Sequence, residues 1–320
     1  MLAKFVFGAV GGICYSCRSS CWCKAPSRSG ISSDGLSNYS LERLPLPTQE
    51  ELEYVKTWGV PWVSDWDRPG VRGIRADRHR SFVRQIVLVR HGQYQYEKSN
   101  DDRIRTLTPL GEEQARRTGQ YLFKAFVQSG IKASGAKGLS ADDIGKAASS
   151  TGSSVGAAAG RNSMGGFLVA PEPKFIHVSD MTRAQQTAKH ILEAFPPHLR
   201  RRLATDAALR ERFPCDPEPT RPNKHATYAD MQTVEAVFEK YFHRTTADES
   251  SVEIIVGHAN VIRYLVCRAL QLPPEAWLRI SLPHCSITSI LIAGNGHVCL
   301  SCLGSAGHLP VDQITTRNVA

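Results

Sequence analysis

The chain of 320 residues lacks any uninterrupted apolar run near the roughly eighteen residues that a membrane-spanning helix requires. It also lacks a glycine-rich phosphate loop, the motif set of protein kinases and a cluster of residues with metal-ligand spacing. Its nine cysteines are odd in number, which argues against a secreted disulfide framework. With 42% hydrophobic residues, however, the chain can build one large or two ordinary globular domains.

Acidic residues are outnumbered by basic ones. The sequence has 30 Asp and Glu against 39 Lys and Arg, a formal charge of +9. This balance favours anionic partners, such as phosphate groups, acidic lipid or nucleic acid, without choosing among them. Nucleic acid is the weakest of these partners, because the basic run from Arg68 to Arg84 has few interleaved aromatic residues and matches no recognised module.

The first 33 residues contain no acidic residue, and basic residues flank their apolar stretch Phe5–Ile13. This combination predicts an N-terminal targeting or anchor segment over residues 1–33. A mitochondrial presequence is favoured, followed by an interfacial or marginal transmembrane anchor and then by a cleaved secretory peptide; a merely disordered terminus is the alternative. Four crowded cysteines in this segment have neither a second spaced pair nor a histidine beside them, so acylation or plain thiols are favoured over a metal site.

Two further segments lack the regular pattern of large apolar residues that builds a hydrophobic core. Residues 34–80 are predicted to be a linker, and residues 129–166, which are mostly Gly, Ala and Ser, a disordered insert within a domain spanning 81–320. The segment 62–67 within the linker contains two Trp and two Asp, although the first Trp is followed by Val63 and not by Asp. This segment favours a docking peptide for this chain or a neighbouring copy; a local packing turn is the alternative. The candidate oligomerisation residues are Trp62, Asp65, Trp66 and Asp67.

The remaining sequence alternates between strand and helix patterns. Strands are expected at 85–89, 174–178, 253–256, 287–293 and 297–303, and helices at 109–126, 182–195 and 261–270. Thr108 and Pro109 are typical of a helix start, Ser179 and Asp180 are the candidates for capping the second helix, and Gly294-Asn-Gly296 indicates a hairpin. The pattern predicts an α/β fold, a three-layer αβα sandwich with a mostly parallel sheet.

Arginine and histidine follow three of the predicted strands. Arg90-His91 follows the first, Arg183 lies shortly after the second, and His258 follows the third. Ligands bind at the carboxyl ends of parallel strands, where arginine provides fork-shaped cations for phosphoryl oxygens. A neutral imidazole in such a positive field keeps a nitrogen available to attack phosphorus. An Arg-His-Gly tripeptide alone could simply cap a strand, but the convergence of three strand ends predicts metal-free phosphoryl transfer through phosphohistidine.

A longer set of motifs resembles the histidine phosphatase (phosphoglycerate mutase-like) superfamily. The motifs are Arg90 to Gly92, Leu107 to Gly111, Gln114-Ala115, Ser179 to Thr187, Leu209 to Glu211 and Gly257 to Ala259. Other segments are similar to the mitochondrial protein phosphatases of that superfamily. They are Trp62 to Asp67, His258 to Tyr264, Cys267 to Leu270, Pro273 to Glu275, Trp277 to Arg279 and Ser286 to Thr288.

This resemblance implies a metal-independent protein Ser/Thr phosphatase. His91 would be the nucleophile, and Glu211 the acid that protonates the leaving oxygen and then the base that activates water. The implied phosphate pocket consists of Arg90, Arg183 and His258, with Asn260 and Ser286 as secondary candidates. No metal or dissociable cofactor is expected. The implied partners are phosphoprotein substrates, further copies of this chain in a homo-oligomer and a mitochondrial membrane, outer or inner, reached through the N-terminus.

Two alternatives keep the same pocket. A small-molecule phosphatase or phosphoglycerate mutase would use the same histidine on another substrate. A catalytically weak membrane scaffold would use the pocket for binding only. Arg212 mildly favours the scaffold, because relatives commonly have glycine after the catalytic glutamate.

Overall fold

The computed structural model describes residues 62–63, 66–67, 82–96, 101–128, 172–222, 224–245 and 249–316. The chain divides into two units, 1–64 and 65–320, and the fold below belongs to the second. The predicted targeting segment 1–33 and the predicted insert 129–166 lie outside the described residues. None of the helices in the described part of the chain combines the length and apolar composition of a membrane span.

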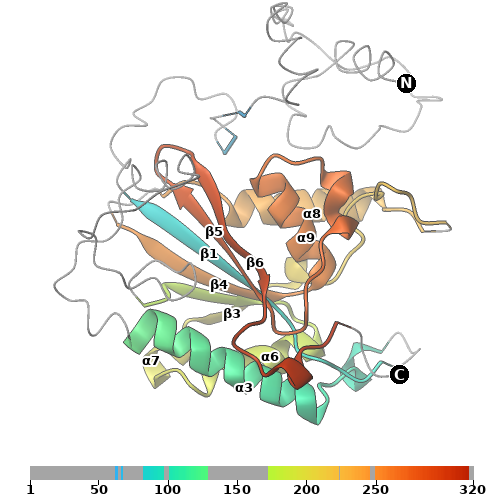
Figure 1. Cartoon of the computed structure of the whole chain (residues 1–320). Helices are drawn as coiled ribbons and strands as arrows, with labels where there is room; N and C mark the ends of the chain where they lie inside the picture. Colours follow the sequence, from blue (N-terminus) through green and yellow to red (C-terminus); the bar gives the residue numbers. More distant parts are fainter. Residues whose placement is uncertain are drawn as a thin grey trace, which may run out of the picture. The chain divides into compact units, whose positions relative to one another are not determined.

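A six-stranded sheet forms the centre of the second unit, in the order β3-β2-β4-β1-β5-β6 (Figure 1). The strands are β1 Val83–Arg90, β2 Phe175–Val178, β3 Leu203–Thr205, β4 Ser251–Gly257, β5 Ile287–Ala293 and β6 Val298–Ser305. Strands β3, β2, β4 and β1 are parallel, whereas β5 runs antiparallel to β1 and β6 antiparallel to β5. The predicted mostly parallel sheet with a terminal hairpin is therefore confirmed.

Helices cover both faces of this sheet. The helices are α3 Pro109–Phe123, α6 Thr182–Leu192, α7 Pro197–Arg200, α8 Tyr228–Tyr241 and α9 Ala259–Ala269. Figure 1 shows α3, α6 and α7 on one face and α8 and α9 on the other. Two separate apolar clusters fill these layers, one with residues of α3 and α6 and one with residues of α8 and α9. The arrangement is the predicted three-layer αβα sandwich.

Strand β1 supplies both clusters because its side chains alternate between the two faces. Val87 and Val89 pack in the cluster with α3 and α6, and Ile86 and Leu88 in the cluster with α8 and α9. Every residue of β1 is buried, as expected for a central strand covered on both sides. The strand is thus rigidly held, and its carboxyl end offers a fixed support for functional side chains.

The helix starts show where local sequence rules succeed and fail. Thr108 caps α3, its Oγ accepting from the Gly111 N–H at 3.0 Å, as predicted. Ser179 and Asp180 do not cap α6. The Thr182 N–H donates instead to Asp102 Oδ2 at 2.5 Å, and Asp180 forms an ion pair with Arg210. A carboxylate from a distant loop has therefore replaced the local cap.

Strand β3 and helices α7 and α8 were not among the predicted elements. Strand β3 is a three-residue edge strand, too short to give a pattern. Helix α8 has a recognisable start, since Thr227 accepts from the Asp230 N–H at 3.1 Å, and buries Val234, Val237, Phe238 and Tyr241 at helical spacing. This cap and spacing are the signal that identifies the helix.

Candidate active site

The parallel pairing of β1 with β4 brings two histidines together. Arg90 lies opposite Gly257 in the register, so the next residue of each strand, His91 and His258, leaves the sheet at the same edge. Their ring centroids lie 5.2 Å apart, and the His91 N–H donates to the Gly257 carbonyl at 2.9 Å. The predicted convergence of strand ends is therefore present.

His91 is held as a neutral ring with a defined hydrogen position. Its Nδ1 lies 2.8 Å from the Gly92 carbonyl oxygen, which can only accept, so Nδ1 carries the hydrogen and Nε2 keeps its lone pair. Burial lowers the pKa of His91 well below its usual value, and the charges of His258, Arg90 and Arg183 lower it further. The ring is 2% exposed. An uncharged imidazole with an available Nε2 is the form that a nucleophile requires.

Arg90 is a buried cation whose N–H groups are only partly hydrogen-bonded. Its Nη1 donates to the Leu282 carbonyl at 2.5 Å, and its Nη2 lies 3.0 Å from His284 Nε2. Burial lowers the pKa of Arg90 to about 10, while the nearby Glu211 opposes this effect. Its Nε is buried without a hydrogen-bond partner in the described part of the chain.

Arg183 enters the site from the first turn of α6. Its side chain is 3% exposed, its Nη1 forms an ion pair with Asp102 at 3.0 Å, and its Cζ lies 4.8 Å from the centre of the Tyr94 ring. Its Nε, like that of Arg90, has no hydrogen-bond partner among the residues that the structure describes. The guanidinium is therefore fixed in orientation, and its Nε–H has no partner among these residues.

His258 completes the cluster from the start of α9. Its Nε2 lies 2.9 Å from Ser179 Oγ, and burial, followed by the charges of Arg183 and Arg90, lowers its pKa well below the usual value. Its Nδ1 is buried and has no partner in the described residues. Three nitrogens around His91, the Nε of each arginine and this Nδ1, thus remain available to oxygen atoms of a ligand.

Glu211 is the acidic residue of the site. Its Oε1 accepts from the Asn260 backbone N–H at 3.2 Å. Burial raises the pKa of Glu211, whereas Arg183, Arg90, the Asn260 N–H and Arg263 oppose this rise. A carboxyl group with a raised pKa holds its proton more readily near neutral pH and is suited to general acid catalysis.

The secondary candidates lie at the edge of this cluster. Asn260 bonds Glu211 through its backbone and donates from Nδ2 to the Arg212 carbonyl at 3.2 Å, so it holds the Glu211 loop. Ser286 is buried, and its carbonyl oxygen accepts from the Arg90 N–H at 3.2 Å. Both residues therefore support catalytic candidates through the contacts that the structure gives them.

The sequence analysis did not identify His284, which is fully buried beside His91 at a ring distance of 5.7 Å. Because Arg90 can only donate, His284 Nε2 accepts and its Nδ1 donates to Thr315 Oγ1 at 2.9 Å. His284 precedes β5, which is antiparallel to β1, so the amino end of β5 lies at the same edge as the carboxyl end of β1. The signal that could have identified His284 is its position just before the first strand of the predicted hairpin.

Part of the predicted docking peptide packs on its own domain. Trp66 Nε1 donates to the Gly296 carbonyl at 2.9 Å, and its ring lies 5.8 Å from that of Phe238. Asp67 forms a buried ion pair with Arg244 at 2.6 Å. Trp62 belongs to the other unit and is 38% exposed, and Asp65 lies outside the described residues. The predicted role of these residues in oligomerisation remains a prediction.

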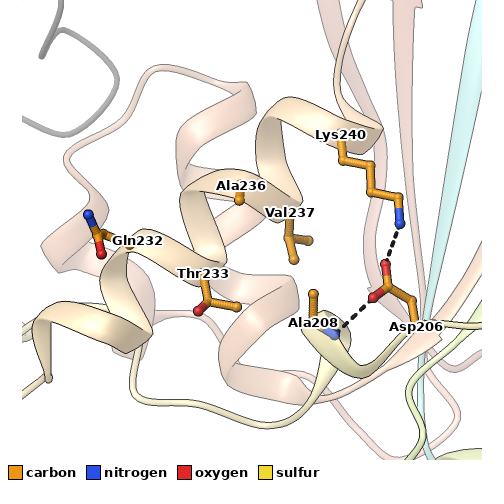
Figure 2. A pocket seen from close by; sticks show the side chains of 7 residues that line it. All are labelled: Asp206, Ala208, Gln232, Thr233, Ala236, Val237 and Lys240. Carbon is orange, nitrogen blue, oxygen red and sulfur yellow. Dashed lines mark hydrogen bonds and ion pairs between the residues drawn. The ribbon is translucent and has the colours of Figure 1, made fainter.

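A surface groove of about 340 Å³ lies elsewhere, along α8 and the 3₁₀ turn Ala207–Leu209 (Figure 2). Its charged lining residues, Asp206 and Lys240, form an ion pair at 2.7 Å, and the Ala208 N–H also donates to Asp206. The lining contains no nucleophile that is activated by a neighbouring base. The histidine cluster at the sheet edge therefore remains the candidate active site.

Comparisons with known proteins identify the family of this chain. Residues 215–302 match the model of the histidine phosphatase superfamily (branch 1). The mitochondrial serine/threonine-protein phosphatase Pgam5 of Drosophila willistoni is 33% identical over 316 residues, which cover 88% of this chain and 92% of that protein. PGAM5 of Rattus norvegicus, also a mitochondrial serine/threonine-protein phosphatase, is 36% identical over 278 residues, which cover 79% of this chain and 80% of that protein.

A solved phosphoglycerate mutase from Plasmodium falciparum is 26% identical, covers 72% of this chain and 96% of its own, and superposes with a TM-score of 0.42. The sequence relatives, matched over most of both chains, establish the family. This chain belongs to the histidine phosphatase superfamily and, within it, to the family of mitochondrial serine/threonine-protein phosphatases.

Proposed function

We propose that this chain hydrolyses phosphoserine and phosphothreonine in proteins through a phosphohistidine at His91. The observation that carries the proposal is a neutral His91 with an available Nε2, surrounded by three buried nitrogens that lack hydrogen-bond partners in the described residues. Two of these nitrogens belong to the guanidinium groups of Arg90 and Arg183. Such a set is complementary to the negative oxygens of a phosphoryl group and to the charge that they carry in the transition state.

In the first step, the lone pair of His91 Nε2 attacks phosphorus, and the bond from phosphorus to the serine or threonine oxygen breaks. Glu211 gives its proton to that leaving oxygen. The phosphorylated ring keeps its hydrogen on Nδ1, and the Gly92 carbonyl stabilises the positive charge of the ring by accepting from it. The raised pKa of Glu211 keeps the donor protonated to a higher pH than an exposed glutamate would be.

In the second step, water attacks phosphorus and loses a proton to the Glu211 carboxylate. The bond between phosphorus and Nε2 breaks, so His91 returns to its neutral form and inorganic phosphate leaves. Glu211 is protonated again and ready for the next cycle. One carboxyl group therefore serves as acid and then as base, as microscopic reversibility allows.

His258 contributes a hydrogen-bond donor rather than a second nucleophile. When the Ser179 hydroxyl donates to His258 Nε2, the hydrogen of the neutral ring lies on Nδ1. This buried N–H then points its dipole at a phosphoryl oxygen, together with the two arginines. Burial keeps the ring uncharged, so the positive charge of the pocket comes from Arg90 and Arg183.

The catalytically weak scaffold finds no support in the position of Arg212. Its Nη1 forms an ion pair with Asp230 in the first turn of α8 at 2.9 Å, and its carbonyl accepts from Asn260. Arg212 therefore links the Glu211 loop to α8. A small-molecule phosphatase would use the same atoms, and a comparison of substrates distinguishes it.

The test is turnover of a phosphothreonine peptide and of 3-phosphoglycerate by wild type, His91→Ala and His198→Ala. His198 is an exposed histidine on α7 and serves as the matched control. The proposal expects faster turnover of the peptide, a loss of about 10⁴-fold or more in His91→Ala, and no loss in the control. Peptide turnover that survives His91→Ala would refute the nucleophile, and faster turnover of 3-phosphoglycerate would favour the small-molecule reading.

We propose further that residues 1–33 attach the chain to a mitochondrial membrane. The acid-free, basic and apolar composition of this segment and the mitochondrial location of the relatives support this placement. Deletion of residues 1–28 is expected to leave the protein in the cytosolic fraction. Unchanged mitochondrial fractionation of the truncated protein would contradict the assignment.

We also propose that Trp62, Asp65, Trp66 and Asp67 form the oligomerisation motif of a homo-oligomer. The presence of two tryptophans and two aspartates within six positions supports this role. The double variant Trp62→Ala, Trp66→Ala is expected to elute as a smaller species in sizing chromatography, whereas Trp58→Ala, which lies outside the motif, should not change the mass. An unchanged mass of the double variant would contradict the proposal.

A further inference from the structure

Asp102 contacts two consecutive residues of a distant helix with its two carboxylate oxygens. It lies in the 3₁₀ turn Asp102–Ile104, between β1 and α3. Its Oδ2 accepts from the Thr182 backbone N–H at 2.5 Å, and its Oδ1 accepts from Arg183 Nη1 at 3.0 Å. The contact therefore crosses 80 positions of sequence and joins the loop after β1 to the start of α6.

The first contact fixes the backbone of the helix that carries Arg183. The residue at the cap position of α6, Met181, makes no capping bond with its side chain. The N–H groups in the first turn of a helix have no partner within the helix, and a carboxylate there is favoured by both hydrogen bonding and the helix dipole. Asp102 supplies this carboxylate and so anchors the turn from which Arg183 projects.

The second contact fixes the guanidinium itself. A guanidinium offers oxygen pairs either the edge of its two Nη groups or the edge of Nε and one Nη. Asp102 occupies Nη1, and the Tyr94 ring lies 4.8 Å from Cζ. On the opposite edge, Nη2 donates only to the Met181 thioether sulfur, at 3.6 Å, and Nε is buried without a hydrogen-bond partner in the described residues. This edge therefore remains the one that can bind oxygen atoms.

We infer that Asp102 is a positioning residue that selects the edge of Arg183 presented to the phosphoryl group. The inference rests on the proposed function and adds to it a carboxylate outside the reacting set. Asp102 touches neither His91 nor the substrate in this account; it acts through Arg183. The Asp102 side chain is 30% exposed and the Arg183 side chain is 3% exposed. Solvent therefore screens this ion pair only weakly.

The test measures the inhibition constant of inorganic phosphate and the KM and kcat of a phosphothreonine peptide in Asp102→Asn. Asparagine keeps an oxygen for the Thr182 N–H but loses the charge that faces Arg183. Asp101→Asn is the matched control, since Asp101 is the adjacent carboxylate, is paired with Arg103 and caps the 3₁₀ turn. We expect the phosphate inhibition constant and KM to rise about 10-fold in Asp102→Asn and to change less than about twofold in the control.

The inhibition constant, KM and kcat distinguish a positioning role of Asp102 from a general loss of folded protein. Loss of folded protein lowers the apparent kcat but leaves the inhibition constant and KM of the remaining enzyme unchanged. Asp102→Glu, which keeps the charge, is expected to recover part of the phosphate affinity. In a double-mutant cycle with Arg183→Lys, removal of Asp102 should have little further effect, because its partner is already displaced.

An unchanged phosphate inhibition constant in Asp102→Asn, or a full additional loss on the Arg183→Lys background, would overturn the inference. If His91→Ala retains activity, the proposed function fails instead. If wild type is active, His91→Ala is inactive and Asp102→Asn matches Asp101→Asn, only the role of Asp102 is refuted.

Discussion

Strand β1 carries a buried arginine near each of its ends, and the two guanidinium groups lie in opposite circumstances. Arg84, 5% exposed, forms an ion pair with Glu253 on the adjacent strand at 2.6 Å and donates to the His243 carbonyl at 2.7 Å. Arg90, 8% exposed, forms no ion pair with a carboxylate in the described residues and donates to a carbonyl and a histidine nitrogen.

The difference shows that burial of a charge does not identify a functional residue. A buried cation needs an opposing charge, and at Arg84 the fold supplies it. At Arg90 the pKa falls to about 10 because burial is not offset by a carboxylate at bonding distance. A ligand with negative oxygens completes this environment. The phosphate site that we propose lies at the end of the strand with the incomplete environment.

The largest effect that distinguishes Arg90 from Arg84 is expected from Arg90→Gln. Glutamine keeps donor groups but removes the positive charge that faces the phosphoryl oxygens. We expect kcat/KM for a phosphothreonine peptide to fall about 10³-fold, as for loss of a buried electrostatic contact in the transition state. The thermal midpoint should stay near the wild-type value, because the variant no longer buries an incompletely paired charge. Unaltered kcat/KM would contradict the role of this end of the strand.

The opposite result is expected for Arg84→Gln. This change leaves Glu253 buried without its cation, which should lower the free energy of unfolding by about 3 kcal/mol. Denaturant unfolding followed by fluorescence measures this loss. The kcat of the protein that remains folded should be close to wild type. A tenfold lower kcat of Arg84→Gln with normal stability would contradict the different roles assigned to the two arginines.

A smaller effect is expected from Glu211→Gln, at about 10²-fold in kcat. Wild type loses activity as the pH rises through the raised pKa of Glu211, because the carboxyl must be protonated to donate. The variant cannot titrate there, so this limb should disappear from its pH profile. A limb of unchanged position in the variant would assign the titration to another group.

The same change has a small effect on stability with a defined sign. A folded-state pKa raised above 4.5 means that folding disfavours the charged carboxylate, and this penalty grows as the pH rises above the unfolded pKa. Glu211→Gln should therefore raise the thermal midpoint at pH 7, and the gain should shrink as the pH falls toward 4.5. A lower midpoint at pH 7 would contradict the burial of this charge.

The sequence predicted the parts of the site that follow from parallel strands. His91 and His258 directly follow β1 and β4, and Arg183 lies in the first turn of the helix after β2. Parallel pairing brings the carboxyl ends of these strands to one edge. His284 precedes an antiparallel strand, and rules about strand carboxyl ends do not reach it. Glu211 follows a short 3₁₀ turn with no periodic pattern, so only the family resemblance indicated it.

Contacts between residues far apart in the sequence were harder to predict from the sequence. Asp102 replaces the local cap of α6 from 80 residues away, and no local pattern encodes that distance. Trp66 and Asp67 were predicted to dock on this chain or a neighbour, and the structure gives them partners in their own domain, including the buried Arg244. The composition indicated that these side chains need a cover, whereas the identity of the cover required the fold.

The most direct test of the account is to capture the phosphorylated enzyme. Wild type and Glu211→Gln are mixed with a phosphothreonine peptide labelled with radioactive phosphate and quenched with alkali, which preserves phosphohistidine. We predict label on His91 at Nε2, because Nδ1 is engaged with the Gly92 carbonyl. His91→Ala should carry no label. Label on Nδ1, label on a residue other than His91, or turnover with no labelled enzyme at any time would contradict the account.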